Sequence, residues 1–105
     1  MAKVAIIAKL TAAEGKRDEL ESILSEIGMK NVAAEDGTEV YALHRDKGDE
    51  NVLWFYELYS GDEALGIHGS SDGMKAMGGA MKGLLGGRPE IIMLEPSAAK
   101  GLDLG

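Results

Sequence analysis

The residues best suited to chemistry gather around one histidine, in the segment YELYSGDEALGIHGSSD at positions 56–72. Histidine ionises near neutral pH, so His68, just ahead of a Gly-Ser-Ser run, is the most suitable general base in this segment. Glu57 precedes it on a predicted strand, where alternation puts its side chain on the same face as Phe55 and Tyr59. The pattern indicates a base and a carboxylate beside an aromatic surface.

Each of these residues also has a purely structural interpretation. A histidine near the end of a helix commonly bonds the last carbonyl groups or pairs with the helix dipole. Glu57 could form an ion pair with Arg45 or Lys9 on a neighbouring strand. Met74 and Met77 could form a soft pocket for an aromatic ring, but their spacing is also that of an ordinary helical core stripe. The residues alone leave both interpretations open.

Length, charge and cysteine content restrict the class of protein. A chain of 105 residues suits one domain, which we expect over 1–96 with a C-terminal tail over 97–105. The net charge of −7, from 18 acidic and 11 basic side chains with no basic cluster, argues against a nucleic-acid partner. The absence of cysteine excludes disulfides and thiolate-bound metals. The first apolar run is too short for a signal peptide or a membrane span, so we expect a cytoplasmic protein with no membrane partner.

Hydrophobic periodicity predicts the elements that position the candidate residues. It predicts strands over 3–10, 38–46, 51–59 and 89–95, and a helix over 13–27 that ends at Gly28. A capping box, Ser60–Glu63, is expected to begin a second helix, which the run 69–72 interrupts before an apolar stripe that ends at Gly86-Gly87. The order βαββαβ predicts an α+β, ferredoxin-like fold, in which both helices cover one face of a four-stranded antiparallel sheet.

The predicted strand over 51–59 is apolar on both of its faces. One face carries Leu53, Phe55 and Tyr59, and the other carries Val52, Trp54, Tyr56 and Leu58. Two helices cover only one face of a sheet, so the other is expected to pack against the same sheet of a second copy. We therefore predict a homodimer in which the two sheets close into an α+β barrel.

Residues 3–96 contain, in order, the segments VAIIAKLTAAEGKRDELESIL, EDGTEVYALHRD, WFYELYSGDEALGIHGSSD and GRPEIIMLEP. Together these segments resemble the antibiotic biosynthesis monooxygenase family, small dimeric α+β barrel proteins that include quinol and anthrone oxygenases. The resemblance implies a homodimer that oxidises a quinol or polyphenolic aromatic with molecular oxygen and needs no cofactor. In this interpretation His68 is the general base, Glu57 and Tyr59 position the substrate, and the pocket is formed by Phe55, Met74 and Met77.

Three positions depart from the patterns of related proteins. Many members carry a second histidine where this chain has Gly73, so a proton relay would use the polar side chains of residues 70–72 or water. The haem-degrading branch of the wider superfamily has an asparagine and a tryptophan where this chain has Ala8 and Tyr59. Two alternatives therefore stay open: a haem-binding or haem-degrading protein with His68 as axial ligand, and a noncatalytic dimeric module that binds a small molecule.

Overall fold

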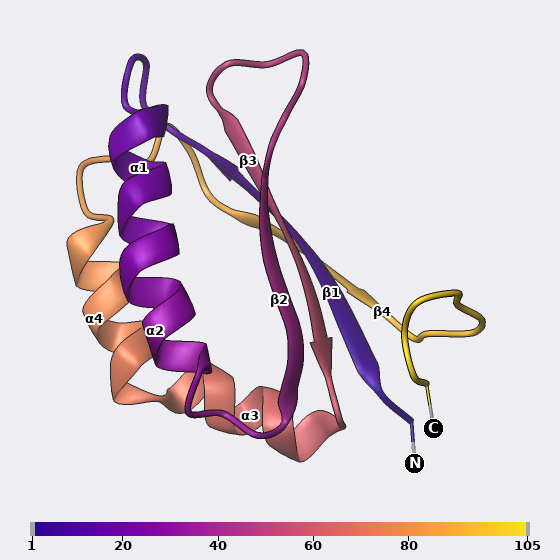
Figure 1. The fold of residues 1–105 in the computed structure, drawn as a ribbon. Coiled ribbons are helices and arrows are strands. Elements are labelled where there is room, and N and C mark those ends of the chain that lie inside the picture. The colour runs from indigo at the N-terminus through magenta and orange to yellow at the C-terminus, as the bar shows by residue number, and fades with distance from the viewer. Residues whose placement is uncertain (1, 105) are drawn as a thin grey trace.

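The chain folds into one antiparallel sheet with all of its helices on one side (Figure 1). The structure is a computed structural model that describes residues 2–104. Met1 and Gly105, the outer ends of the predicted domain and tail, lie outside the described residues. In chain order the elements are β1 (Val4–Thr11), α1 (Arg17–Ile23), the π-helical turn η1 (Leu24–Gly28), α2 (Met29–Val32), β2 (Thr38–Arg45), β3 (Val52–Tyr59), α3 (Asp62–Ser70), α4 (Asp72–Ala80) and β4 (Glu90–Leu94).

The sheet has the strand order β2-β3-β1-β4, and all of its neighbouring strands are antiparallel. The order and topology confirm the predicted ferredoxin-like α+β fold. The division into a domain over 1–96 and a tail over 97–105 stays a prediction. Among residues 2–104, no helix has both the length and the apolar character needed to cross a bilayer.

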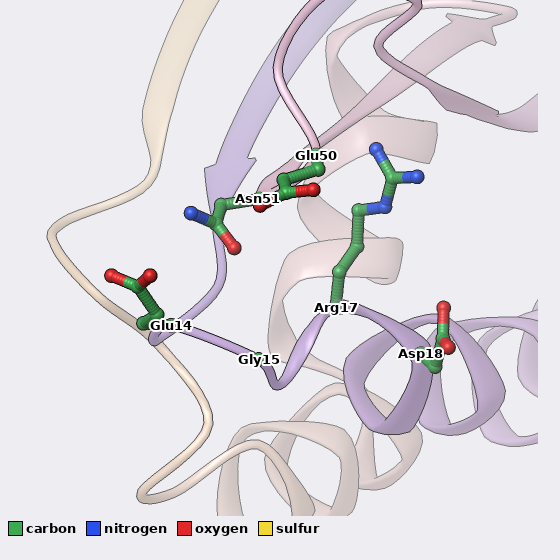
Figure 2. A pocket seen from close by; sticks show the side chains of 6 residues that line it. All are labelled: Glu14, Gly15, Arg17, Asp18, Glu50 and Asn51. Carbon is green, nitrogen blue, oxygen red and sulfur yellow. The ribbon is translucent and has the colours of Figure 1, made fainter.

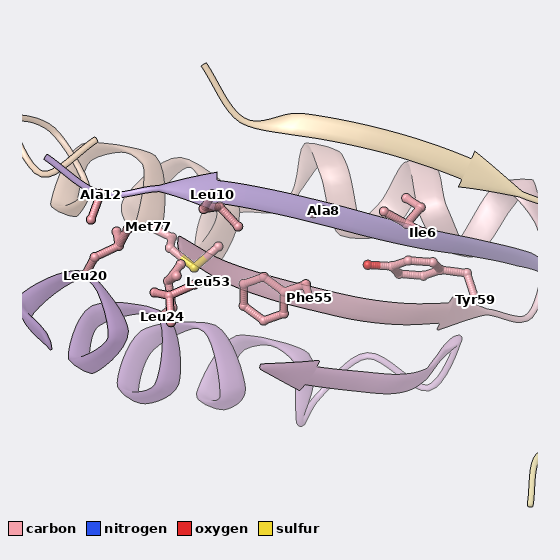
Figure 3. Close-up of a cluster of buried hydrophobic side chains, with 10 residues drawn as sticks. All are labelled: Ile6, Ala8, Leu10, Ala12, Leu20, Leu24, Leu53, Phe55, Tyr59 and Met77. Atoms are coloured by element: carbon pink, nitrogen blue, oxygen red, sulfur yellow. The ribbon is translucent and has the colours of Figure 1, made fainter. Parts of the chain in front are cut away.

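The hydrophobic core lies between the helices and the inner face of the sheet, which is the face that the helices cover. Because side chains alternate along a strand, every second residue of the central strands β1 and β3 points into this layer. Helix residues pack against them from the other side. Figure 3 shows the ten buried side chains: Ile6, Ala8, Leu10, Ala12, Leu20, Leu24, Leu53, Phe55, Tyr59 and Met77.

The first helix does not end at Gly28, so that prediction is wrong. Gly28 keeps right-handed helical angles, and α1, η1 and α2 form one continuous helical stretch from Arg17 to Val32. Gly28 permits close approach, since a Cβ there would lie 3.3 Å from Met77 Sδ and 3.5 Å from the Tyr41 ring. The π-helical turn inserts one extra residue, which changes the helix face at the core.

Three other helix boundaries also differ from the predictions. The first helix begins at Arg17 and not at position 13. Ser60 does not cap α3, because Gly61 is the N-cap residue and no side chain bonds there. The last helix ends at Ala80, well before the Gly86-Gly87 pair that was expected to stop it. The interruption over 69–72 is confirmed, since Ser71 caps α4 by accepting a 3.1 Å hydrogen bond from the Met74 amide.

Gly37 brings α3 close to the start of β2. The Ser60 amide donates a 2.9 Å hydrogen bond to the Gly37 carbonyl, which ties the end of β3 to the turn before β2. A Cβ at position 37 would lie only 2.4 Å from the Ala64 Cβ on α3. The bare glycine therefore sets the distance between this turn and the helix that carries His68.

Gly37→Ala should lower the free energy of unfolding by about 1–3 kcal/mol, because neither clashing Cβ can move without its backbone. Gly66→Ala is the matched control on α3, where an added Cβ meets no heavy atom within 4 Å. It should raise stability by up to about 1 kcal/mol, since alanine favours the helix. Urea unfolding measures both changes, and equal stabilities of the two variants would contradict the prediction.

Candidate functional site

A cavity of about 270 Å³ lies between the inner face of the sheet and the helices. Its lining is largely apolar, and it includes five of the six residues that the sequence analysis named for a site. These five are Phe55, Glu57, His68, Met74 and Met77. The sixth, Tyr59, does not line the cavity, but its fully buried side chain contacts two of the residues that do.

His68 lies near the end of α3 with only 5% of its surface exposed, although it lines the cavity. Its Nδ1 is 2.8 Å from Glu35 Oε1, in the turn before β2. The same carboxylate oxygen accepts a 2.8 Å hydrogen bond from Thr38 Oγ1. Because a carboxylate only accepts, the pair assigns the hydrogen to Nδ1 and leaves the Nε2 lone pair of the neutral ring free to take a proton.

Glu57 is a buried carboxylate on β3, 7% exposed, which lines the same cavity. The Tyr59 hydroxyl donates a 2.5 Å hydrogen bond to Glu57 Oε1. Burial raises the pKa of Glu57, and the Tyr59 hydrogen bond and the charge of His68 oppose that rise. Burial, followed by the hydrogen bond to Glu57, also raises the pKa of Tyr59, so its hydroxyl keeps its proton as a donor.

Two residues of this site, Glu35 and Tyr41, were missed by the sequence analysis. Tyr41 lies directly opposite Glu57 in the β2–β3 pair, with its ring centroid 4.5 Å from Phe55 and 5.4 Å from His68. Burial, and then the nearby carboxylates, raise the pKa of Tyr41, which keeps its hydroxyl protonated. Hairpin pairing was the signal for Tyr41, whereas Glu35 gives no periodic signal because it lies in a turn.

Glu57 has different partners from those proposed for its structural interpretation. Arg45 instead bonds Glu21 through Nε at 2.9 Å, and Lys9 Nζ lies 3.8 Å from Glu90. The carboxylate that bonds the imidazole of His68 is Glu35 and not Glu57. The carboxylate of Glu57 therefore remains directed at the cavity and at Tyr59.

The serines after His68 are engaged with the helix backbone. Ser70 Oγ donates to the Gly66 carbonyl at 2.8 Å, and Ser71 Oγ donates to the His68 carbonyl at 2.9 Å. At Gly73, an added Cβ would lie 2.4 Å from the Asn31 side chain. This packing leaves no room for a larger side chain unless Asn31 moves.

Another hollow, of about 370 Å³, lies between the start of α1 and the β2–β3 loop and is polar (Figure 2). Arg17 lines it, and its Nη1 donates to the backbone carbonyls of Asp46 and Asp49, at 3.4 and 3.0 Å. These bonds tie α1 to the β2–β3 loop, which is a structural role. Within residues 2–104, no three His, Cys, Asp or Glu side chains are grouped so as to hold a metal ion.

Replacing Glu57 should change the pH dependence of stability. Its pKa in the unfolded chain is near the ordinary value of 4.5 and is raised in the folded protein. Between these two values the folded state binds more protons, so the free energy of unfolding falls as pH rises. Glu57→Gln removes this loss, and its stability relative to the original protein should increase as the pH rises above about 4.5 toward neutral.

Urea unfolding across that range measures the difference. Glu26→Gln, which removes an exposed carboxylate from η1, is the control and should give a nearly constant difference. A constant difference for Glu57→Gln as well would show that Glu57 ionises in the folded protein as it does in the unfolded chain.

Several solved structures are similar to this chain. A Caulobacter crescentus protein, provisionally named an antibiotic biosynthesis monooxygenase, is 34% identical over 92% of each chain, with a TM-score of 0.87. A Pseudomonas aeruginosa protein is 28% identical over 93% of this chain and 97% of its own, with a TM-score of 0.84. A Mycobacterium tuberculosis protein is 26% identical over 92% of this chain and 97% of its own, with a TM-score of 0.82. No curated protein matches the chain.

The sequence also matches a family pattern directly. A sequence profile described as antibiotic biosynthesis monooxygenase matches residues 3–79, which span β1 to α4 and include both His68 and Glu57. The match covers well over half of the chain, and the fold agrees with it. The chain therefore belongs to the antibiotic biosynthesis monooxygenase family.

Proposed function

We propose that this protein is a cofactor-independent monooxygenase that oxidises a quinol or polyphenolic aromatic with molecular oxygen. One observation carries the proposal: a buried imidazole, held through Nδ1 by Glu35, lines an apolar cavity together with Glu57. Family membership supports the reaction class. The cavity supports an aromatic substrate, because Phe55, Met74 and Met77 offer soft apolar contacts to a ring.

The reaction needs a base more than it needs a binding site for oxygen. A hydroquinone reacts slowly with triplet oxygen, but its anion can give up one electron. His68 Nε2 removes a hydroxyl proton, the anion transfers an electron to oxygen, and the two radicals combine to form a carbon–oxygen bond. The oxygen–oxygen bond then breaks: one atom stays on the ring, the other leaves as water, and the substrate supplies all the electrons.

The neighbouring groups have distinct roles in this scheme. Glu35 is a positioning residue that fixes the tautomer and the direction of the His68 ring. Glu57 binds a substrate hydroxyl with the oxygen that Tyr59 does not occupy. Tyr59 holds that carboxyl group in place, and the low polarity of the cavity strengthens each of these hydrogen bonds.

The test is oxygen uptake by metal-free protein with a reduced naphthoquinol, corrected for spontaneous oxidation. His68→Ala should lower the enzymatic rate by at least about tenfold, since a general base contributes about 10²–10⁴-fold. His44→Ala is the matched control, because His44 is the other histidine and lies exposed on β2. Glu35→Ala should lower kcat and also weaken the Nδ1-protonated preference of His68, which the imidazole ¹⁵N shifts report.

Each contrary result has a definite meaning. Equal rates for the original protein and His68→Ala would make the imidazole a structural group. Uptake no faster than in buffer would favour the noncatalytic binding module. A Soret shift on titration with haem that His68→Ala abolishes would favour haem binding instead.

We also propose that the protein forms a homodimer through the outer face of the sheet, which the helices leave uncovered. One row of side chains crosses all four strands on this face: Ala42, Tyr56, Ile7 and Ile92. Ile92 is 51% exposed, although it lies on the strand that pairs with β1. An apolar row of this kind is typical of a face that packs against another sheet.

Sedimentation velocity should therefore show a dimer, and Ile92→Lys should shift the protein toward monomer, because it would bury a charge in the interface. Ile67→Lys is the control, since Ile67 is similarly exposed, at 57%, but lies on α3. A monomeric original protein, or an Ile92→Lys variant that stays fully dimeric, would contradict the proposed interface.

A further inference from the structure

The polar groups of the cavity are gathered at one of its ends. Strand pairing places Tyr41, Glu57 and Ile6 in one row across β2, β3 and β1. His68 approaches the same row from α3, with its ring 5.4 Å from that of Tyr41. These three polar side chains, Tyr41, Glu57 and His68, are the only ones among the residues lining the cavity, and we call this the polar end.

The remainder of the cavity is apolar. The next row along the strands places Phe55 beside Ala8, and the row after it places Leu53 beside Leu10. Leu24 and Met77 close over these rows, as Figure 3 shows. From Glu57 to Leu53 is four residues of strand, or roughly 13 Å.

Met81 lies at the far limit of this apolar part. It lines the cavity, and its carbonyl accepts a 2.9 Å hydrogen bond from the Leu84 amide, next to the bridge between Leu85 and Ala12. Ala12 follows β1 directly, beyond Leu10. A ligand that fills the cavity thus meets hydrogen-bonding side chains at one end and methionine and leucine at the other.

We propose that the cavity selects fused-ring aromatics whose hydroxyl groups all lie on one terminal ring, with the opposite ring bare. The hydroxylated ring meets Glu57 and His68, and the bare ring lies among Leu10, Leu24 and Met81. A hydroxyl group at the bare end would be buried without a partner, which is costly in an apolar site. This inference rests on the proposed function only in assigning the cavity to an aromatic substrate.

The test compares two isomers of dihydroxynaphthalene, one with both hydroxyls on the same ring and one with a hydroxyl at each end. The isomers have the same size and neutral charge, so the position of the oxygens is the variable. Binding is measured by calorimetry without oxygen. The isomer with both hydroxyls on one ring should bind at least about tenfold more tightly. Equal affinities, the reverse preference, or no binding of either isomer would overturn the proposal.

A variant tests where the selectivity arises. Met81→Gln places an amide at the apolar end and should reduce the preference several-fold, by giving the distal hydroxyl a partner. Met29→Gln is the matched control, because Met29 packs against the core but does not line the cavity. An unchanged preference in a folded Met81→Gln protein would overturn the assigned orientation, and the comparison of isomers with the original protein stands whether or not the variant folds.

The binding experiment and the oxygen-uptake experiment can fail separately. Selective binding without oxygen uptake would contradict the monooxygenase proposal and support the proposed selectivity of the cavity. Oxygen uptake without selective binding would keep the monooxygenase and remove this inference.

Discussion

The burial of two ionisable side chains, Glu57 and His68, is the constraint on which the site depends. A charged or polar group placed in an apolar layer costs free energy unless it finds hydrogen-bond partners. Each of these groups has one: Tyr59 donates to Glu57, and Glu35 bonds His68 Nδ1. Each pair leaves one atom, a carboxylate oxygen or a ring nitrogen, available to the cavity. The same two contacts therefore stabilise the buried side chains of Glu57 and His68 and leave one atom of each for chemistry.

Small residues make these contacts possible by letting the layers come together. Gly37 allows α3 to approach the turn that carries Glu35, and Gly28 allows the first helical stretch to approach Tyr41 and Met77. Leu24, the first residue of the π-helical turn Leu24–Gly28, is buried in the core and lines the cavity. Glycine acts here through the absence of a side chain, since Gly28 itself has ordinary helical angles.

Much of this arrangement could be predicted from the sequence, because it follows from alternation within single strands. The β3 face that carries Phe55, Glu57 and Tyr59 needs only a period of two, and the helical stripe with Met74 and Met77 needs only a period near four. The strand order follows from short connections and a familiar packing solution.

The features of the site that could not be predicted from the sequence are those that depend on contacts between segments far apart in the chain. Tyr41 lies opposite Glu57 only because of the register between β2 and β3, which is irregular between Thr38 and Val40. A shift of one residue would turn Tyr41 to the outer face. Glu35 reaches His68 across 33 positions of sequence through a turn, which no local pattern encodes. Gly28 was misjudged because a glycine that permits close packing looks, in sequence, like one that ends a helix.

A site with one histidine, His68, can be reconciled with base chemistry through the charges around it. When Nε2 accepts a proton, the imidazolium is bonded at Nδ1 by Glu35, and its charge also acts on Glu57, whose pKa the charge of His68 lowers. A nearby carboxylate stabilises the cation by direct attraction, which is strong in a weakly polar interior. A second histidine would add another site of protonation, but it is not needed to balance this charge.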